Sequence, residues 1–283
     1  MAALQGIKRR IRSVSGIHQI TKAQQLVAAS KLRRVQTAAL APQAYTQAAG
    51  ELLERLSRSP EVRKHPLFQE RKVNKALTIV IAGDRGMAGA YNSNVLRALG
   101  RHVHELGVPQ EAICVGRRAS MNVSHARDVD EIASYEISNP EPDIAVVQPV
   151  LHTIIDRFLT HQVDVVNVIY TRFVSTVKQE VRVEQLLPIV RPEGKAVASE
   201  FEPEPEELVD VAVRRVLEAK VLQAVLEARA SEEAARMMAM MNATDNAGEL
   251  IGDLTLAYNN ARQANITQEL AEISGGAEAI TAQ

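Results

Sequence analysis

The chain has 283 residues, of which 46% are apolar but only 3% aromatic, and its formal net charge is −1. This length allows one large core or several smaller units, and the lack of tryptophan disfavours a single globule packed around large rings. No run of 18 apolar residues and no apolar secretion signal is present, so we expect a soluble protein that acts inside the cell.

The first block, residues 2 to about 57, is predicted to form one long helix. Its side chains recur at alternating three- and four-residue steps, which is typical of a coiled-coil seam, and the middle of this seam is polar. The seam positions are Leu4, Ile7, Ile11, Val14, His18, Thr21, Gln25, Ala28, Leu32 and Val35.

Charge is distributed unevenly between the two ends. Residues 1–50 contain eight Lys or Arg and no acid, whereas 15 acids and six Lys or Arg follow from Glu202 onward. Nucleic acid, an acidic membrane surface and an acidic protein are all possible partners for the basic helix. Because residues 1–44 contain no Phe, Tyr or Trp and the seam has a polar middle, an acidic protein surface fits best.

Residues 74 to about 190 have the pattern of a small α/β unit. Short apolar runs rich in β-branched residues predict strands that are buried on both faces. These runs cover residues 76–83, 112–116 and 163–171. The alternating pattern after Thr171 predicts an antiparallel strand at the edge of a parallel sheet.

Helical patterns separate the predicted strands. They cover residues 94–106, 117–125 and 142–162. Pro149 either kinks the last of these helices or marks its true start. Residues 191–207 then have the Pro, Gly and Glu content of a linker.

The last block, Leu208 to Gln283, contains no proline and is predicted to be helical. A seam of mostly small residues is expected at Met240, Ala243, Ala247, Leu250, Leu254, Ala257, Ala261 and Ala264. The methionines at 237, 238, 240 and 241 suit either plain core or adaptable contact with more than one partner. A connection that begins and ends at one α/β unit returns the chain along itself, so we expect the terminal helices to pair antiparallel.

The stretch GDRGMAGAYN, residues 83–92, follows a predicted strand as phosphate-binding loops do. Its glycines are spaced G-x-x-G-x-x-G and precede Ala90 and Tyr91, so it matches neither the Walker loop nor the dinucleotide fingerprint. The spacing favours a structural turn with Asn92 or Ser93 as the helix cap. A nucleotide-binding enzyme built on the α/β unit, and a coiled-coil adaptor with no moving role, are the alternative functions.

Other residues with potential chemistry have structural interpretations. Cys114 is predicted to be a small core residue, and His102 and His104 are predicted to be solvated on different helix faces. Glu232 and Glu233 are expected on a solvated helix face, with an ion-pair role as the alternative. We therefore expect no catalytic, cofactor or metal site.

Long stretches of this chain resemble the gamma subunit of F-type ATP synthase. They are GIKRRIRSVSGIHQITKAQQLVAASKLRR at 6–34, the run from SEEAARMM to GGAEAI at 231–280, and GDRGMAGAYNSN at 83–94, which is similar to the Ser-Asp-Arg-Gly-Leu-Cys-Gly-Gly loop common in the family. The resemblance implies a long antiparallel coiled coil of the terminal helices plus a small Rossmann-like α/β domain. The corresponding domain boundaries are 1–57, 74–190 and 208–283.

The resemblance also implies a function. Members of this family are the central-stalk rotor of proton-translocating ATP synthase, and they couple ion-driven rotation of the membrane c-ring to conformational change in the catalytic beta subunits. The expected partners are three alpha and three beta subunits, the epsilon subunit and the c-ring, with no nucleic acid and no small-molecule substrate. The chain would be a non-catalytic, cofactor-free peripheral protein on the cytoplasmic face of the bacterial cell membrane.

Contact residues follow from the same resemblance. On the basic part of the shaft, which faces acidic lever segments of beta, they are Lys22, Lys31, Arg33 and Arg34. In the glycine turn they are Asp84, Arg85 and Ala88, and we expect Asp84 and Arg85 either to make such contacts or to fix the turn. On the last helix they are Glu232, Arg236, Arg262, Gln263, Thr267 and Glu272. Ala88 stands where the family loop has cysteine and the cysteine-bearing insert of chloroplast members is missing, so we expect no thiol control.

Overall fold

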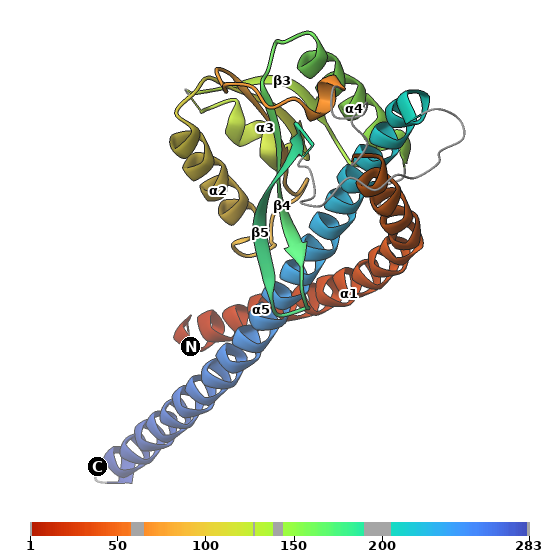
Figure 1. The fold of residues 1–283 in the computed structure, drawn as a ribbon. Helices are drawn as coiled ribbons and strands as arrows, with labels where there is room; N and C mark the ends of the chain where they lie inside the picture. The colour runs from red at the N-terminus through yellow and green to blue at the C-terminus, as the bar shows by residue number, and fades with distance from the viewer. Residues whose placement is uncertain (1, 58–64, 127, 138–143, 190–204, 282–283) are drawn as a thin grey trace. The chain divides into compact units, whose positions relative to one another are not determined.

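The structure is a computed structural model that describes the backbone of residues 2–57, 65–126, 128–137, 144–189 and 205–281. Side chains are described in the same ranges except at 2–3, 40–47, 49, 52–57, 144–146, 205–208 and 275–281. The chain forms two compact units, which we call the helix-pair unit (residues 1–27 and 237–283) and the sheet unit (residues 28–236). Both boundaries lie inside long helices, α1 (Ala2–Ser57) and α5 (Pro205–Thr281), which appear as continuous ribbons in Figure 1.

In the helix-pair unit, α1 and α5 run antiparallel, as the sequence predicts. The Thr244 hydroxyl donates to the Thr21 hydroxyl across the pair (2.9 Å) and also bonds the Met240 carbonyl (2.7 Å). Three residues earlier on α1, His18 lies beside Gly248, four residues later on α5. The polar middle of the seam is therefore hydrogen-bonded, which removes the cost of burying hydroxyl groups there.

The seam on α1 is confirmed at every predicted position, because each of these side chains is buried or half-buried. On α5 the prediction is partly right. Met240, Ala243, Ala247, Leu254 and Ala261 are buried or half-buried as predicted, although Thr244 is more buried than its neighbour Ala243. Further along, Leu250, Ala257 and Ala264 are exposed, and the half-buried positions are one residue later, at Ile251, Tyr258 and Asn265. Apolarity alone could not find Thr244, which takes a buried place because its hydroxyl has partners.

The sheet unit contains five strands in the order β3-β2-β1-β4-β5. Their bounds are β1 Ala76–Ile81, β2 Gln110–Val115, β3 Val129–Tyr135, β4 Val165–Phe173 and β5 Gln179–Leu187. Neighbours among β3, β2, β1 and β4 pair parallel, and β5 pairs antiparallel with β4 as predicted. Strand β3 was not predicted from the sequence, because this edge strand is half exposed and its acidic residues obscure the apolar pattern.

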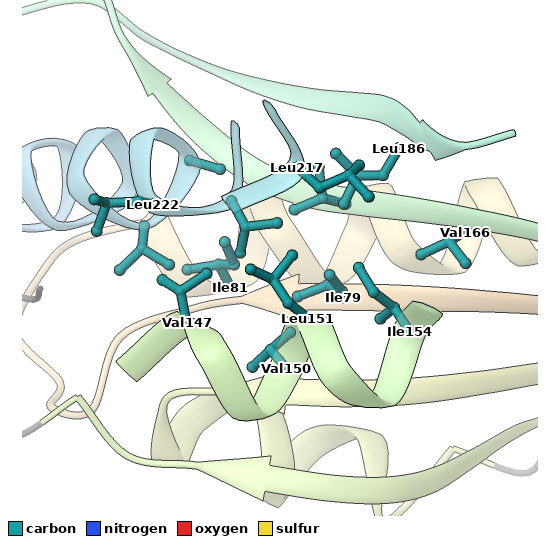
Figure 2. Packing of buried hydrophobic residues seen from close by; sticks show 14 of the residues in the cluster. Ile79, Ile81, Val147, Val150, Leu151, Ile154, Val166, Leu186, Leu217 and Leu222 are labelled. Atoms are coloured by element: carbon teal, nitrogen blue, oxygen red, sulfur yellow. The ribbon is translucent and has the colours of Figure 1, made fainter. Parts of the chain in front are cut away.

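Helices cover both faces of the sheet. On one face, α2 (Tyr91–Leu106) and α3 (Arg117–Val123) pack on a cluster around Val80 and Cys114. On the other face, α4 (Ile144–Leu159) and α5 pack on the larger core. Figure 2 shows this core, where Ile79 and Ile81 of β1 meet Ile154 of α4 and Leu217 of α5.

Successive residues of a strand point to opposite faces, and this explains why β1 contributes side chains to both cores.

Pro149 lies inside α4, in the second turn, rather than at the start of the helix. A short 3-10 helix, η2 (Pro66–Phe68), closes the edge near the end of β5 through a bond from the Ile189 amide to the Leu67 carbonyl (2.9 Å). The predicted linker, 191–207, lies mostly outside the described residues. No helix in the described ranges is both long and apolar enough to cross a bilayer.

Candidate functional site

Residues 228–236 of α5, which we call the clamp segment, cross the carboxyl ends of the strands. The Tyr91 hydroxyl, at the start of α2, donates to the Ala228 carbonyl (3.1 Å). The Ser231 hydroxyl donates to the Thr171 carbonyl near the end of β4 (2.9 Å). Burial, together with the nearby Glu232 carboxylate, raises the pKa of Tyr91, so its hydroxyl stays protonated and able to donate.

Glu232 is the centre of the clamp segment. It is 1% exposed, and its carboxylate pairs with Arg229 (2.9 Å) on one oxygen and with Arg236 on the other. Arg236 also pairs with Glu233 (2.7 Å), which is 4% exposed. Burial alone would lower the pKa of Arg236, but Glu232 and Glu233 more than offset this and raise it.

The predicted solvated face for Glu232 and Glu233 is therefore wrong, and the alternative, an ion-pair role, is what the structure has. Gly83 lies directly beside Glu232, and buried carboxylates persist here because arginines three and four residues away neutralise them. The spacing of Arg229, Glu232 and Arg236 in the sequence indicates such pairs, so a signal for the cluster was present. Arg229 itself was not identified as a functional residue from the sequence.

The glycine turn approaches this cluster closely. A β-carbon built on Gly83 would lie 2.7 Å from Oε1 of Glu232, so the chain's own carboxylate occupies the space beside the turn. The Gly83 amide donates to Oδ1 of Asn92 (2.9 Å). Asn92 thus fixes the turn and is not the helix cap, which is Ala90 without a side-chain bond. The Glu232 carboxylate therefore leaves no room for a phosphate group directly beside Gly83.

Asp84 and Arg85 have different roles in the turn. Oδ1 of Asp84 accepts from the Arg117 amide at the first residue of α3 (3.1 Å), and its Oδ2 lies 3.5 Å from the Arg229 guanidinium. Asp84 therefore fixes the turn, one of the two roles expected for it. Arg85 is exposed to solvent.

A charged hollow of about 260 Å³ opens beside the clamp segment. It brings together predicted contact residues from three parts of the sequence, namely Lys31, Asp84, Arg85, Glu232 and Arg236. Arg117, Glu136, Ile137, Arg229 and Glu233 complete the lining. Within the described part of the chain, the side chains of Lys31 and Arg85 form no ion pair or hydrogen bond, so two cations are free at this hollow.

The remaining predicted contact residues do not line the hollow. Arg33 and Arg34 are exposed on α1 in the sheet unit, and Ala88 is buried within the turn. The other five predicted contact residues lie in the helix-pair unit and are exposed, namely Lys22, Arg262, Gln263, Thr267 and Glu272. Among the described residues, the side-chain bonds that they form stay within their own helix, such as Thr267 to the Gln263 carbonyl (3.0 Å).

His102 differs from its prediction. It is half-buried and its Nε2 lies 3.1 Å from Nδ2 of Asn167 on β4, whereas His104 is exposed as expected. Burial lowers the pKa of His102, which favours the neutral ring as an acceptor for the Asn167 amide. Among the residues that the structure describes, no group of three His, Cys, Asp or Glu side chains could hold a metal ion.

Comparisons with known proteins agree with this architecture. The family described as ATP synthase matches residues 3–280. The ATP synthase gamma chains of Moorella thermoacetica and Macrococcus caseolyticus are 40% and 37% identical to this chain, and each alignment covers 99% of this chain and all of the relative. Among solved structures, the central stalk and c-ring of Tetrahymena thermophila mitochondrial ATP synthase contains a chain with 25% identity and a TM-score of 0.64, aligned over 79% of this chain and 99% of that one.

A chain in the Euglena gracilis mitochondrial ATP synthase has the same fold, with a TM-score of 0.67 at 20% identity over 99% of this chain and 95% of that one. The relatives align from end to end, so the helices and the sheet unit are shared together. This chain belongs to the family of ATP synthase gamma chains.

Proposed function

We propose that this chain is the rotating central stalk of a proton-translocating F-type ATP synthase. It couples rotation of a membrane c-ring to conformational change in catalytic beta subunits. Relatives at about 40% identity are named ATP synthase gamma chain, and similar solved chains belong to a central stalk with its c-ring and to an F1 assembly. The proposed partners are three alpha subunits, three beta subunits, an epsilon subunit and the c-ring, at the cytoplasmic face of a bacterial membrane.

The observation that carries a mechanical rather than a catalytic role is the position of Glu232 beside the glycine turn. In open α/β sheets, ligands bind outside the carboxyl ends of the strands. Here the chain's own helix crosses that edge, and Glu232 fills the space next to Gly83. This supports the proposal that the chain itself is non-catalytic and that nucleotide is bound by its partners.

A rotor acts through contacts that differ between the states of its partner. To shift a partner from 1% to 99% population of one state, the rotor must bind that state about 5.5 kcal/mol more tightly than the other. We propose that Lys31 and Arg85, the free cations of the charged hollow, meet an acidic segment of a beta subunit. In the same way we propose contacts with the surrounding subunits for Lys22, Arg33, Arg34, Arg236, Arg262, Gln263, Thr267 and Glu272.

The test is a charge reversal in the assembled enzyme. We expect Lys31→Glu with Arg85→Glu to lower ATP-driven proton pumping per ATP hydrolysed in membranes that hold the whole enzyme with its c-ring, because acidic side chains would then repel one another. Arg97→Glu is the matched control, since Arg97 is an exposed arginine of α2 outside the hollow. Equal pumping by the double variant and the control would contradict the contact.

The competing function, a nucleotide-binding enzyme, is tested on the full chain alone. Calorimetric titration with Mg·ATP should release no heat of binding, because the clamp segment occupies the edge of the sheet where a nucleotide would bind. Micromolar binding that Gly83→Ala abolishes would favour that alternative.

A further inference from the structure

The apolar side chains that the clamp segment buries are all small, although it belongs to a helix that must carry torque in the proposed function. They are Ala228, Ala230 and Ala234. Apolar contact is not directional, and short smooth side chains oppose rotation of a helix about its own axis only weakly. Hydrogen bonds and ion pairs have preferred directions, so the polar contacts of this segment add resistance to twisting that its alanines do not supply.

Arg229 makes the polar contacts that reach furthest from α5. Its guanidinium lies 3.5 Å from Oδ2 of Asp84 after β1, donates to the Ile137 carbonyl after β3 (3.2 Å) and pairs with Glu232 on its own helix (2.9 Å). Its side chain is 13% exposed, so solvent screens these contacts little. A planar fork of five N–H groups allows one side chain to serve three acceptors at once.

The contacts of Arg229 extend through its partners into the rest of the sheet unit. Asp84 also accepts from the Arg117 amide at the start of α3, and Glu232 also holds Arg236, whose Nε points to the Gly86 carbonyl (3.5 Å). One side chain of α5 is therefore connected to the turn after β1, to the end of β3 and to α3.

We propose that Arg229 is a positioning residue that locks α5 to the sheet unit against rotation about the helix axis. The lock deepens the proposed rotor function and rests on it, because a stalk transmits torque only if its helix and the body that carries it turn together. Glu232 and Asp84 are the acidic partners of the lock. Two further polar contacts join the segment to the sheet unit, from the Tyr91 hydroxyl to the Ala228 carbonyl and from the Ser231 hydroxyl to the Thr171 carbonyl.

The first test is local and uses the full chain alone. In Arg229→Ala, amide hydrogens of residues 228–236 should exchange at least about tenfold faster than in the unchanged chain, because charged hydrogen bonds that hold the segment are lost. Arg229→Lys should restore only part of the protection, since one ammonium cannot reach Asp84 and the Ile137 carbonyl together. Unchanged exchange in Arg229→Ala would overturn the lock.

Arg157→Ala is the matched control. Arg157 on α4 pairs with the buried Glu111 at the start of β2 (2.6 Å), so its loss weakens another buried ion cluster without removing a contact of the clamp segment. This variant should leave exchange in residues 228–236 unchanged. If Arg229→Ala fails to fold, Asp84→Asn removes the charge of one acceptor at almost constant shape and should speed the same exchange.

The second test measures torsion in the assembled enzyme. With the catalytic subunits immobilised and a probe on the sheet unit, Arg229→Ala should widen the angular fluctuation of the stationary rotor, while Arg157→Ala should not. Equal fluctuation in all three proteins would overturn the torsional role. If the unchanged chain does not assemble with alpha and beta subunits, the rotor function fails, whereas the exchange measurement still decides whether Arg229 holds the segment.

Discussion

Gly83→Ala is the substitution whose cost follows most directly from the geometry of the clamp segment. The new β-carbon would lie 2.7 Å from Oε1 and 2.9 Å from Cδ of Glu232, where ordinary contact begins at 3.4 Å. Glu232 cannot withdraw freely, because arginines hold both of its oxygens. Overpacking of this kind costs about 1–3 kcal/mol, so we expect the free energy of unfolding to fall by that amount.

A second Gly→Ala change separates this clash from the general effect of adding a methyl group. Gly100 lies in the interior of α2, and a β-carbon there would meet nothing within 4 Å. Gly100→Ala should therefore stabilise the protein by up to ~1 kcal/mol, since alanine is the better helix former. The assay is the urea midpoint of unfolding followed by circular dichroism. A Gly83→Ala midpoint equal to or above that of the unchanged chain would refute the close approach of Glu232.

Three other predictions follow from buried groups of the sheet unit. Gly116→Ala should lower the free energy of unfolding more than Gly83→Ala does. The reason is that φ is +99° at Gly116 and a β-carbon there would lie 2.1 Å from the Ala82 carbonyl oxygen, a backbone atom that cannot rotate away. Equal urea midpoints for the two variants would contradict this. Burial raises the pKa of the Cys114 thiol to about 12, so alkylation by iodoacetamide at pH 8 should occur only at the rate of unfolding, and fast labelling of the folded chain would contradict the burial. Burial lowers the pKa of His102 below its unfolded value of about 6.5. The stability that neutral His102 contributes is therefore complete above that pH and is lost as the pH falls through the folded pKa. The melting temperature of His102→Gln should vary less between pH 7.5 and 5.5 than that of the unchanged chain, and equal variation in both proteins would exclude His102 as the cause of the pH dependence.

The parts of the fold that the sequence predicts well are those in which one physical signal dominates. The steps from Leu4 to Val35 follow a single helical face, and each of these side chains is at least half-buried. The buried strands β1 and β4 are mostly apolar and rich in β-branched residues, and the residue types of β5 alternate as in an edge strand. In each case the residue types of the element predict which of its faces are buried.

The errors occur where a polar side chain takes a buried position because of a partner distant in the sequence. Thr244 is buried because of Thr21, and His102 is half-buried beside Asn167. Glu232 is buried because the turn after β1 covers it, although its arginine partners were visible three and four residues away. Local patterns give the charge and spacing of such groups, but they do not show which loop will cover them.

The charged hollow illustrates the same division. The basic character of Lys31 and the glycine turn with Arg85 were both evident in the sequence, but their proximity depends on the packing of α1 and the turn around α5. The resemblance to a family assigned a contact role to both residues, whereas residue patterns alone could not predict that they lie close together. Arg229 was found only through its distances to Asp84 and to the Ile137 carbonyl.

The rotor function is tested most directly by observing rotation. The chain should be co-expressed with alpha and beta subunits, the complex immobilised through the catalytic subunits, and a probe attached to the sheet unit of this chain. The proposed function predicts a complex with three alpha and three beta subunits in which ATP hydrolysis turns the probe in one direction. An ATP-hydrolysing complex in which the probe does not turn, or the absence of any such complex, would contradict it.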